Sequence, residues 1–413
     1  MILHRRPANK RKIINDPVHG FITLPDELIF DLIEHPYFQR LRRIKQLGLS
    51  HLVYPGANHT RFHHALGAMH LMVKSIEVLR SKNIEVTEEE RIGAAVAILL
   101  HDIGHGPFSH TLEHSLLKSV HHEELSLLFM QRLNEEFNGQ LDIAIAIFTD
   151  KHPKAFLHQL VSSQLDMDRL DYLQRDSYFT GVSEGVVGSD RIIAMLNVKD
   201  NQLVIEEKGI YSIENFIGSR RIMYWQVYMH KTVVSSEFML TSILKRAKFL
   251  YRNGIDLFAS PSLKLFLEEE ITHNDFERNA NILESFALID DSDISSAIKV
   301  WQSVDDKILS TLCTNVASRN LFKTVISKTP FDSETILKQR EKIKAVLGVS
   351  EAEVDYFLKT ETLVNNAYSE KHKQIQILGK NDEILGLAQA SDNYNISALS
   401  EPVEKHYMCF FRC

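Results

Sequence analysis

The feature that most constrains the fold of this chain is a long succession of helical patterns between residues 26 and 252. Within each pattern, apolar residues return every three or four positions, as expected of an α-helix with one buried face. The patterns cover residues 26–48, with a break near Pro36, and residues 64–82, 87–102, 122–137, 161–179 and 212–252. Amphipathic helices must bury their apolar faces against one another, so the sequence predicts a mainly α fold.

Short β-hairpins interrupt these helices. We expect them at residues 13–24, 198–212 and 374–388, where turn-forming residues separate short β-type runs. A soft boundary falls near residues 253–262, because the segment NGIDLFASPS breaks the helical pattern. The expected organisation is therefore a helical core domain with small hairpins, residues 1–255, followed by a mostly helical region with minor β structure, residues 256–413.

Composition excludes several classes of protein. No apolar stretch approaches the roughly 20 residues that cross a bilayer, and the basic N-terminus lacks the apolar segment of a secretory signal. The formal charge of −7 argues against broad nucleic-acid binding. The three cysteines have the spacing of neither a metal site nor a disulfide framework. We therefore expect a cytoplasmic protein without a membrane or nucleic-acid partner.

The segment ILLHDIGHGPFSH, which begins at Ile98, suggests a metal site. An apolar helical run ends there in His101-Asp102, and imidazole and carboxylate groups are ligands of divalent transition metals. Adjacent helical residues point about 100° apart, so the pair can share an ion only at a helix end, which the following Gly and Pro residues provide. Taken alone, the pair also fits a capping Asp beside a packed His.

Two other segments supply residues of the same chemical types. NHTRFHHALG has His64 at the start of a helix, and LDMDRLDYLQRD has Asp168, Tyr172 and Asp176 at positions i, i+4 and i+8 of one helical face. An ordinary half-exposed helix with arginine partners is the alternative reading of the second segment.

Together these ordered segments resemble the HD-domain metal-dependent phosphohydrolases. The chain is most similar to the deoxynucleoside triphosphate (dNTP) triphosphohydrolase branch, which includes the dGTPases, and INDPVHGFITL, FQRLRRIKQLG, YPGANHTRFHHALG and RNLFK also match that branch. The resemblance implies one divalent ion, of iron, manganese, zinc, nickel or magnesium. The metal ligands that it implies are His64, His101, Asp102 and Asp168.

The resemblance also implies roles for residues around the ion. The catalytic candidates are His105, His110, Glu113, His122 and Glu123, and the histidine that donates a proton to the leaving oxygen is left open. The residues implied to hold the nucleotide are Gln46, Leu47, Arg61, Arg169, Tyr172, Asp176, Arg220, Tyr228 and His230. This chain departs from the family pattern at Tyr224 and Met229, where relatives have His and Gln, so the base preference is also left open.

A regulatory nucleotide site at a subunit interface is implied in the same way. Its residues are Lys12, Asn15, Glu34, Gln39, Arg42, Arg319 and Lys323. We therefore expect a homo-oligomer, a dimer or tetramer, activated by GTP or a dNTP. The alternative is that the basic residues between positions 40 and 45 form a solvated helix face.

The function favoured by the sequence is metal-dependent hydrolysis of dNTPs to a deoxynucleoside and triphosphate. One alternative is an HD phosphohydrolase that acts on nucleoside monophosphates or cyclic nucleotides. Another is a nucleotide-binding sensor or scaffold with a structural metal. The several basic residues implied near the ion favour a long phosphate chain as the substrate.

Overall fold

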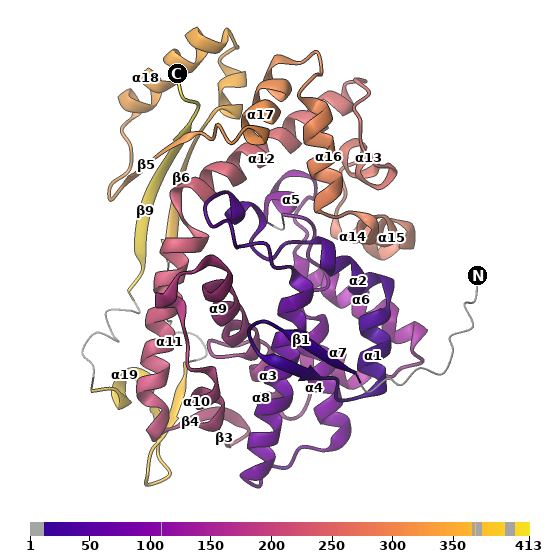
Figure 1. Cartoon of the computed structure of the whole chain (residues 1–413), viewed down its shortest axis with the longest axis vertical. Helices are drawn as coiled ribbons and strands as arrows, with labels where there is room; N and C mark the ends of the chain where they lie inside the picture. The colour runs from indigo at the N-terminus through magenta and orange to yellow at the C-terminus, as the bar shows by residue number, and fades with distance from the viewer. Residues whose placement is uncertain (1–11, 109, 366–367, 369–373, 393–400) are drawn as a thin grey trace.

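The computed structural model describes residues 12–108, 110–365, 368, 374–392 and 401–413. Within these residues the chain is mainly helical with three small sheets, as the sequence predicts. In Figure 1 the first half of the chain, indigo to magenta, forms the lower and central part of the molecule. The orange and yellow C-terminal segments cover the top and run along one side.

Most helices around the functional site come from the first 200 residues. Their bounds are α1 (Glu27–Glu34), α2 (Pro36–Gln39), α3 (Arg61–Ser81), α4 (Glu88–Leu100), α5 (His110–Ser115), α6 (His122–Glu136), α7 (Asp142–Phe148), α8 (Ala155–Val161), α9 (Met167–Thr180) and α10 (Ser189–Ala194), with 3-10 turns η1 (Arg40–Arg43) and η2 (Gly48–Leu52). The predicted break near Pro36 is confirmed: this proline begins α2, because its fixed φ and missing N–H suit the first turn of a helix.

The helices α3, α4 and α9 bring distant parts of the sequence together. α3 packs against both α4 and α9 through buried apolar side chains. α4 begins with a capping box, in which the Glu90 amide donates to the Thr87 hydroxyl and the Thr87 amide donates to the Glu90 carboxylate. The end of α4 meets the first turns of α3 and α9, and the candidate metal ligands lie at that junction.

The prediction of one continuous helix over residues 212–252 is wrong in its middle. The structure has α11 (Ile210–Met223), a π-helical turn η5 (Tyr224–Tyr228) and α12 (Lys231–Arg252). The Met229 amide donates to the Tyr224 carbonyl five residues earlier, which closes the wider turn. His230 then takes an extended conformation and caps α12 by accepting from the Thr232 amide. Apolar periodicity does not reveal such a turn, because the flanking helices keep their own pattern.

A hairpin is present at each of the three predicted places, but the second ends at Glu206, and residues 207–212 are helical instead of extended. The hairpins are formed by β1 (Ile13–Asp16) with β2 (Gly20–Thr23), β3 (Leu196–Lys199) with β4 (Gln202–Glu206), and β7 (Gln376–Leu378) with β8 (Ile384–Gly386). Asp200 and Asn201 both have positive φ, as the tight turn between β3 and β4 requires. β7 also pairs in parallel with β4, so the late hairpin joins the earlier one in a four-stranded sheet.

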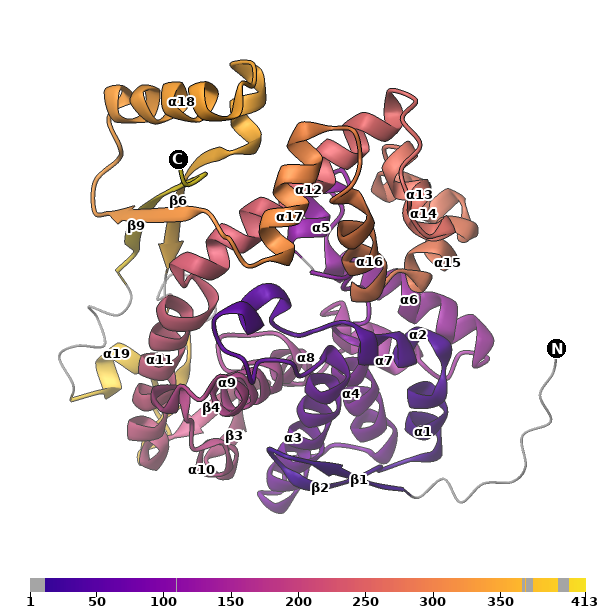
Figure 2. The ribbon, with the colours of Figure 1, turned by 45° about the horizontal axis from the view of Figure 1, so that its top comes forward.

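A further sheet in the C-terminal region is not predicted by the sequence. It has the order β5 (Lys323–Ser327), β9 (Val403–Phe410) and β6 (Leu358–Asn365), with both pairings antiparallel. Figure 2 shows these strands at one side of the molecule, below α18 (Ser333–Leu347). The strands are far apart in the sequence and no tight turn joins β9 to either neighbour, so no local signal marks their pairing.

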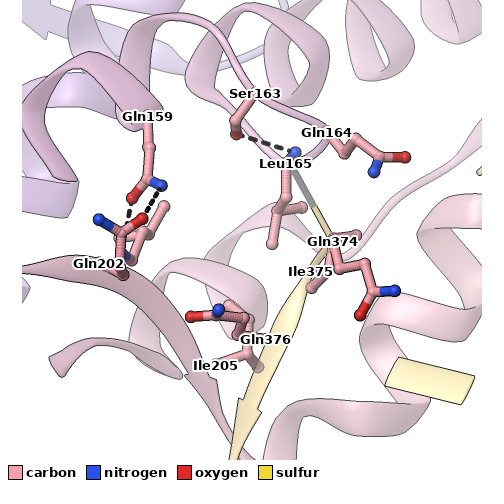
Figure 3. Close-up of a pocket in the computed structure, with 10 residues that line it drawn as sticks. Gln159, Ser163, Gln164, Leu165, Gln202, Ile205, Gln374, Ile375 and Gln376 are labelled. Atoms are coloured by element: carbon pink, nitrogen blue, oxygen red, sulfur yellow. Dashed lines mark hydrogen bonds between the residues drawn. The ribbon is translucent and has the colours of Figure 1, made fainter. Parts of the chain in front are cut away.

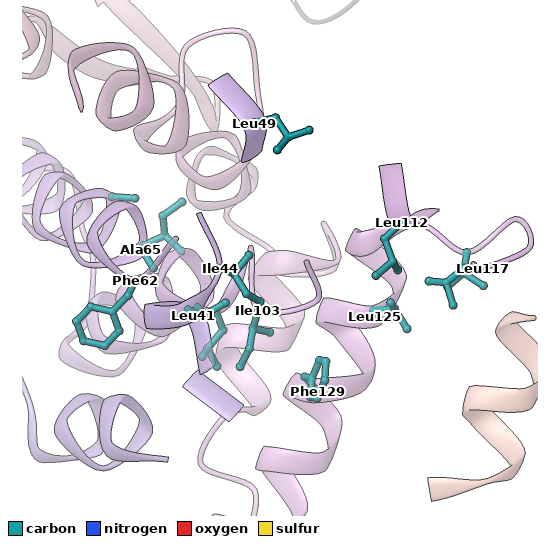
Figure 4. Close-up of a cluster of buried hydrophobic side chains, with 14 of the residues drawn as sticks. Leu41, Ile44, Leu49, Phe62, Ala65, Ile103, Leu112, Leu117, Leu125 and Phe129 are labelled. Atoms are coloured by element: carbon teal, nitrogen blue, oxygen red, sulfur yellow. The ribbon is translucent and has the colours of Figure 1, made fainter. Parts of the chain in front are cut away.

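The remaining helices pack onto the first half of the chain. They are α13 (Pro261–Glu268), α14 (His273–Arg278), α15 (Ala280–Leu288), α16 (Asp291–Trp301), α17 (Lys307–Ala317) and α19 (Leu387–Ala390). One buried apolar cluster runs through both parts, and Figure 4 shows Leu41, Ile44 and Ile103 within it. A division at residues 255 and 256 stays a prediction. No helix of the described part combines the length and apolar character needed to cross a bilayer.

Candidate metal centre and nucleotide cavity

Three of the four predicted metal ligands form a compact group. Nε2 of His64 lies 3.4 Å from Nε2 of His101 and 3.1 Å from Oδ1 of Asp168, and the last two atoms are 3.5 Å apart. Ligand atoms bound to one divalent ion at roughly 2.0–2.2 Å lie about 3–3.5 Å from one another. The group therefore fits a shared divalent ion, whose identity this mixed ligand set does not determine.

Each member of the group sits where a helix begins or ends. His64 and Asp168 lie in the first turns of α3 and α9, and His101 directly follows the last residue of α4. The chain can turn away after α4 because Gly104 has no side chain: a Cβ there would lie 2.2 Å from the His122 carbonyl oxygen. The glycine of the HDIGHG segment thus lets α6 pack directly against the loop that follows the ligand.

Both imidazole rings are oriented with Nε2 toward the group. Nδ1 of His64 donates to Asp171 at 2.8 Å, and Nδ1 of His101 donates to the Ile98 carbonyl at 2.6 Å. With the hydrogen on Nδ1, each Nε2 is an acceptor, which is the tautomer that binds a metal. Two such nitrogens and a carboxylate facing one another require a cation or a proton between them.

The buried charges around the group leave a surplus of negative charge. Three buried carboxylates, those of Asp16, Asp102 and Asp171, are paired with the two guanidinium groups of Arg61 and Arg175, and the partly exposed Asp168 adds a fourth carboxylate beside His64. Burial alone would lower the pKa of His64, but its hydrogen bonds with Asp168 and Asp171 raise that pKa to about 10. The same surplus favours a divalent cation, which competes with that proton.

Asp102, the fourth predicted ligand, lies beside the group. Its carboxylate is 3.3 Å from Nε2 of His101 and 3.8 Å from Nε2 of His64. Arg61 also donates to it at 2.5 Å. Burial would raise the pKa of Asp102, but the charges of His101, His105 and Arg61 hold it well below its usual range. Asp102 is therefore a charged neighbour of the group, and its role as a ligand stays a prediction.

The sequence interpretation missed the buried residues that hold His64. Asp171 is fully buried, and its two oxygens accept from His64, from Nε2 of His19 at 2.6 Å, and from Nε and Nη2 of Arg175 at 2.9 Å each. Arg175 also donates to Asp16 in β1 at 2.8 Å. The i, i+4 spacing of Asp171 and Arg175 is the one sequence signal that could have indicated this ion pair.

Gly67 makes room for these charged groups beside α3. A Cβ at this position would lie 1.9 Å from Oδ1 of Asp171 and 2.2 Å from Nη2 of Arg175. No side chain fits in that space, so glycine is required one helical turn after His64 for the ion pair to reach the ligand.

Two of the predicted catalytic histidines stack on each other. The rings of His105 and His122 have centroids 3.8 Å apart and are nearly parallel. Burial and the charge of Arg61 lower the pKa of His105 to about 3, although Asp102 opposes the shift. At neutral pH His105 is therefore uncharged, which disfavours it as a source of a proton.

The loop between α4 and α5 is held by a buried arginine. Arg40 donates to the carbonyl oxygens of Ile103 and His105 at 2.8 Å each, and this fixes the backbone that follows the metal group. The predicted catalytic residues His110 and Glu113 lie on α5, and their side chains are outside the described part of the structure.

A cavity of about 390 Å³ opens onto the group, and clefts of this size hold small ligands. Ten predicted site residues line it: Gln46, Leu47, Arg61, Asp102, His105, His122, Asp168, Tyr172, Asp176 and Tyr228. Its remaining lining residues are Gly48, Ser50, Phe108, Tyr224, Met229, Val233 and Glu237. Glu237 is the charged residue among them that the sequence interpretation missed, because it lies on α12 beyond His230, the last substrate residue that the resemblance implies.

Comparisons with known proteins agree with this site. An HD domain model matches residues 61–176, and a model of an HD associated region matches residues 187–252. The Bacillus subtilis protein YwfO is 33% identical over 400 residues, which are 93% of this chain and 88% of that protein. The chain belongs to the HD-domain phosphohydrolases. A crystal structure of a phosphohydrolase from Bacteroides thetaiotaomicron is 53% identical, with a TM-score of 0.94 over 97% of this chain and 100% of that one.

A further relative of this HD-domain phosphohydrolase has a named activity. It is the deoxynucleoside triphosphate triphosphohydrolase SAMHD1 homolog of Dictyostelium discoideum, 36% identical over 255 residues. The match covers 57% of this chain and 49% of that protein.

Three residues that the sequence predicts to hold the substrate do not line this cavity: Arg169, Arg220 and His230. Arg169 is 3.5 Å from the Tyr172 hydroxyl and donates to the Ser163 carbonyl at 2.7 Å. Arg220 lies on α11 near the same tyrosine, and burial lowers its pKa. His230 caps α12. The two arginines therefore flank Tyr172 next to the cavity.

A second cavity of about 290 Å³ reaches the HD-domain metal group from another side. It shares Asp102, His122 and Asp168 with the first cavity and is also lined by Glu123 and His158. Glu123, a predicted catalytic residue, therefore faces this second space. The metal group is accessible from two directions.

A third pocket of about 120 Å³ lies between the loop before α9, β4 and β7 (Figure 3). Five glutamines line it, and Gln159 donates to Gln202 at 2.6 Å and accepts from the Leu203 amide at 2.7 Å. None of its described lining residues is charged, in contrast to the carboxylates and imidazoles of the HD-domain site. It shares no lining residue with the other two cavities.

The residues predicted to bind a regulatory nucleotide fall into two groups. Lys12, Asn15, Glu34, Gln39 and Arg42 lie on or beside β1, α1, α2 and η1, whereas Arg319 follows α17 and Lys323 begins β5. Gln39 accepts from Arg42 at 2.9 Å, and Arg319 donates to the Leu52 carbonyl at 2.9 Å. In Figures 1 and 2 β5 lies well away from the β1–β2 hairpin. The regulatory site stays a prediction.

Proposed function

We propose that this HD-domain phosphohydrolase converts dNTPs to a deoxynucleoside and inorganic triphosphate. The observation that carries the proposal is the 390 Å³ cavity, whose lining includes Asp168, Arg61 and Tyr172. The 36% identity to the Dictyostelium dNTP triphosphohydrolase supports the same substrate class. In this proposal His64, His101, Asp102 and Asp168 hold one divalent metal ion.

The reaction adds a water oxygen to the α-phosphorus and breaks the bond between that phosphorus and O5′. When bound, a divalent ion supplies an activated water and neutralises charge on the phosphoryl oxygens. Arg61, beside Asp102 in the cavity wall, contributes a guanidinium to the same phosphoryl group. Triphosphate leaves with the new oxygen, and O5′ of the deoxynucleoside takes a proton.

The protonation state of His105 reduces the number of candidates for the proton donor. The pKa of His105, about 3, leaves this ring without a proton to give at neutral pH. His122, stacked on His105 and lining both cavities, is the better candidate among the described side chains. Glu123 is proposed to act with His122, and Glu113 is proposed to orient the ring of His110.

The sugar and base would lie along the rest of the cavity. Tyr172 would pack against C2′ of the deoxyribose and exclude a 2′-hydroxyl by its bulk. Tyr228, whose hydroxyl donates to Asp176 at 2.8 Å, would border the sugar. Oε1 of Gln46 is buried without a hydrogen-bond partner among the described residues and can accept from a base.

Two other functions make different predictions. A phosphohydrolase for nucleoside monophosphates or cyclic nucleotides needs few phosphate contacts, whereas Arg169 and Arg220 beside Tyr172 support a longer phosphate chain. A sensor or scaffold with a structural metal needs a closed site, whereas the cavities on two sides support turnover.

The decisive experiment incubates the protein with each dNTP, a monophosphate and a cyclic nucleotide, with defined metals, in water enriched in oxygen-18. We expect unlabelled deoxynucleoside and triphosphate that carries one labelled oxygen. Pyrophosphate or orthophosphate as the first product would contradict the proposal. Hydrolysis of only monophosphates or cyclic nucleotides would favour the first alternative, and binding without turnover the second.

We also propose activation of a homo-oligomer by GTP or a dNTP at the predicted regulatory residues. The separation of β5 from the β1–β2 hairpin supports a site completed by a second copy. Light scattering and initial rates with and without GTP test this, with Arg42→Ala and Lys323→Ala as variants. Unchanged rates and size across all added nucleotides would contradict it.

A further inference from the structure

The β1–β2 hairpin buries one face and exposes the other. Ile13 and Phe21 are 63% and 73% exposed, whereas Ile22 is fully buried. Two polar side chains share the buried side: the side chain of Asp16 is 3% exposed and that of His19 is 6% exposed. Burial of a polar side chain is costly unless a hydrogen-bond partner replaces the lost water. The buried partners of Asp16 and His19 therefore show what the hairpin is attached to.

Asp16 shapes the turn of the hairpin and connects it to α9. Its Oδ1 accepts from the amides of Val18 and His19 at 2.9 Å each. Its Oδ2 accepts from Nη1 of Arg175 at 2.8 Å. The turn held by Asp16 aims the ring of His19 at Asp171, to which Nε2 donates at 2.6 Å.

Both connections end on the carboxylate that orients His64. Asp171 accepts from His64 with the oxygen that also accepts from Nε of Arg175, and from His19 with the oxygen that also accepts from Nη2 of Arg175. A carboxylate with four donors cannot rotate without losing some of them. Removal of Asp16 leaves Nη1 of Arg175 to compete for Asp171, and removal of His19 leaves one oxygen with a single donor.

We propose that Asp16 and His19 are positioning residues for the ligand His64, so that the affinity for a divalent ion depends on the docked hairpin. This inference rests on the proposed metal-dependent function. The β1–β2 hairpin, about 150 residues away from α9 in the sequence, would then complete the metal site. Partners of metal-binding imidazoles are typically worth about 10–100-fold in metal affinity.

The test measures Mn²⁺ affinity of the full chain by titration calorimetry, with Asp16→Asn and His19→Leu as variants. We expect affinities about 10–100-fold weaker than that of the wild type. His19→Gln, which keeps a side-chain N–H donor, is expected to recover part of the loss. Asp305→Asn makes the same change of carboxylate to amide at an exposed position and should leave the affinity unchanged.

A second readout separates positioning from general loss of structure. The visible spectrum of bound Co²⁺ reports ligand geometry, and we expect it to change in His19→Leu while circular dichroism of the metal-free protein does not. Absence of Mn²⁺ and Co²⁺ binding by the wild type would refute the proposed metal site itself. If folded His19→Leu keeps the Mn²⁺ affinity and the Co²⁺ spectrum of the wild type, only the positioning role is refuted. These two measurements on His19→Leu test the inference even if Asp16→Asn does not fold.

Discussion

The two ends of the 390 Å³ cavity are built in different ways. At the metal end, His64 is held by the fully buried Asp171 and Arg175, which continue to the N-terminal hairpin. At the other end, Met229 and Glu237 are only partly buried, and Oε1 of Gln46 has no partner among the described residues. The metal group is therefore tied to the folded core, whereas in the proposed function the choice of base would rest on a few side chains that can change independently.

The largest effect is expected at the metal end, from Asp168→Ala. This variant removes the carboxylate that lies within 3.5 Å of both ligand imidazoles. We expect turnover of every dNTP to fall to background, measured as triphosphate released, and bound metal to fall in parallel. A metal-stripped Asp168→Ala protein that still hydrolyses dNTPs would remove the metal centre from the mechanism.

The next largest effect is expected from Asp171→Asn. The amide keeps the shape of the carboxylate but loses the charge that holds Arg175 and the His64 tautomer. We expect a loss of about 10–100-fold in metal affinity, with the relative rates for the four dNTPs unchanged. A changed order of dNTP preference would mean that the two ends of the cavity are coupled.

Gly67→Ala tests the close packing at the metal end. Its Cβ would meet Asp171 and Arg175, so we expect the free energy of unfolding in denaturant to fall by about 1–3 kcal/mol. Gly218→Ala is the matched control, because a Cβ there meets nothing within 4 Å. Alanine is the better helix former, so the control should gain up to about 1 kcal/mol. Equal effects at both positions would argue against the close contact.

The smallest effect is expected at the other end, from Glu237→Gln. A carboxylate accepts from base N–H groups, whereas an amide also donates to base acceptors. We expect kcat/KM ratios among dNTPs to shift by about tenfold, the effect of one hydrogen bond, with unchanged metal affinity. Glu268→Gln, at an exposed position on α13, serves as control. Uniform loss for all four dNTPs would place Glu237 in catalysis instead of base choice.

The same contrast explains what the sequence could predict. His64, His101 and Asp168 each sit at a helix end that local patterns mark, and family resemblance joined them into one site. The sequence does not reveal the role of Asp171 because its partners His64 and His19 lie 107 and 152 residues away, and burial of a charge network is decided by tertiary packing. Short-range spacing reveals only the pair of Asp171 with Arg175.

The fold shows the same division between local and distant signals. Helices and hairpins with regular patterns were predicted, including the tight turn at Asp200. The π turn that begins at Tyr224 was not, since it leaves the apolar pattern of its flanking helices intact. The β5–β9–β6 sheet was not predicted either, because no short turn connects the strands that pair in it.

The β1–β2 hairpin reaches Asp171 and Arg175 through His19 and Asp16, and Asp171 in turn accepts from His64. Local opening of the hairpin would therefore release the partners of the proposed metal ligand. An ion that binds only the docked form opposes that opening by mass action. In the proposed metal site, added metal is therefore expected to make opening of this hairpin rarer and to slow its cleavage by proteases.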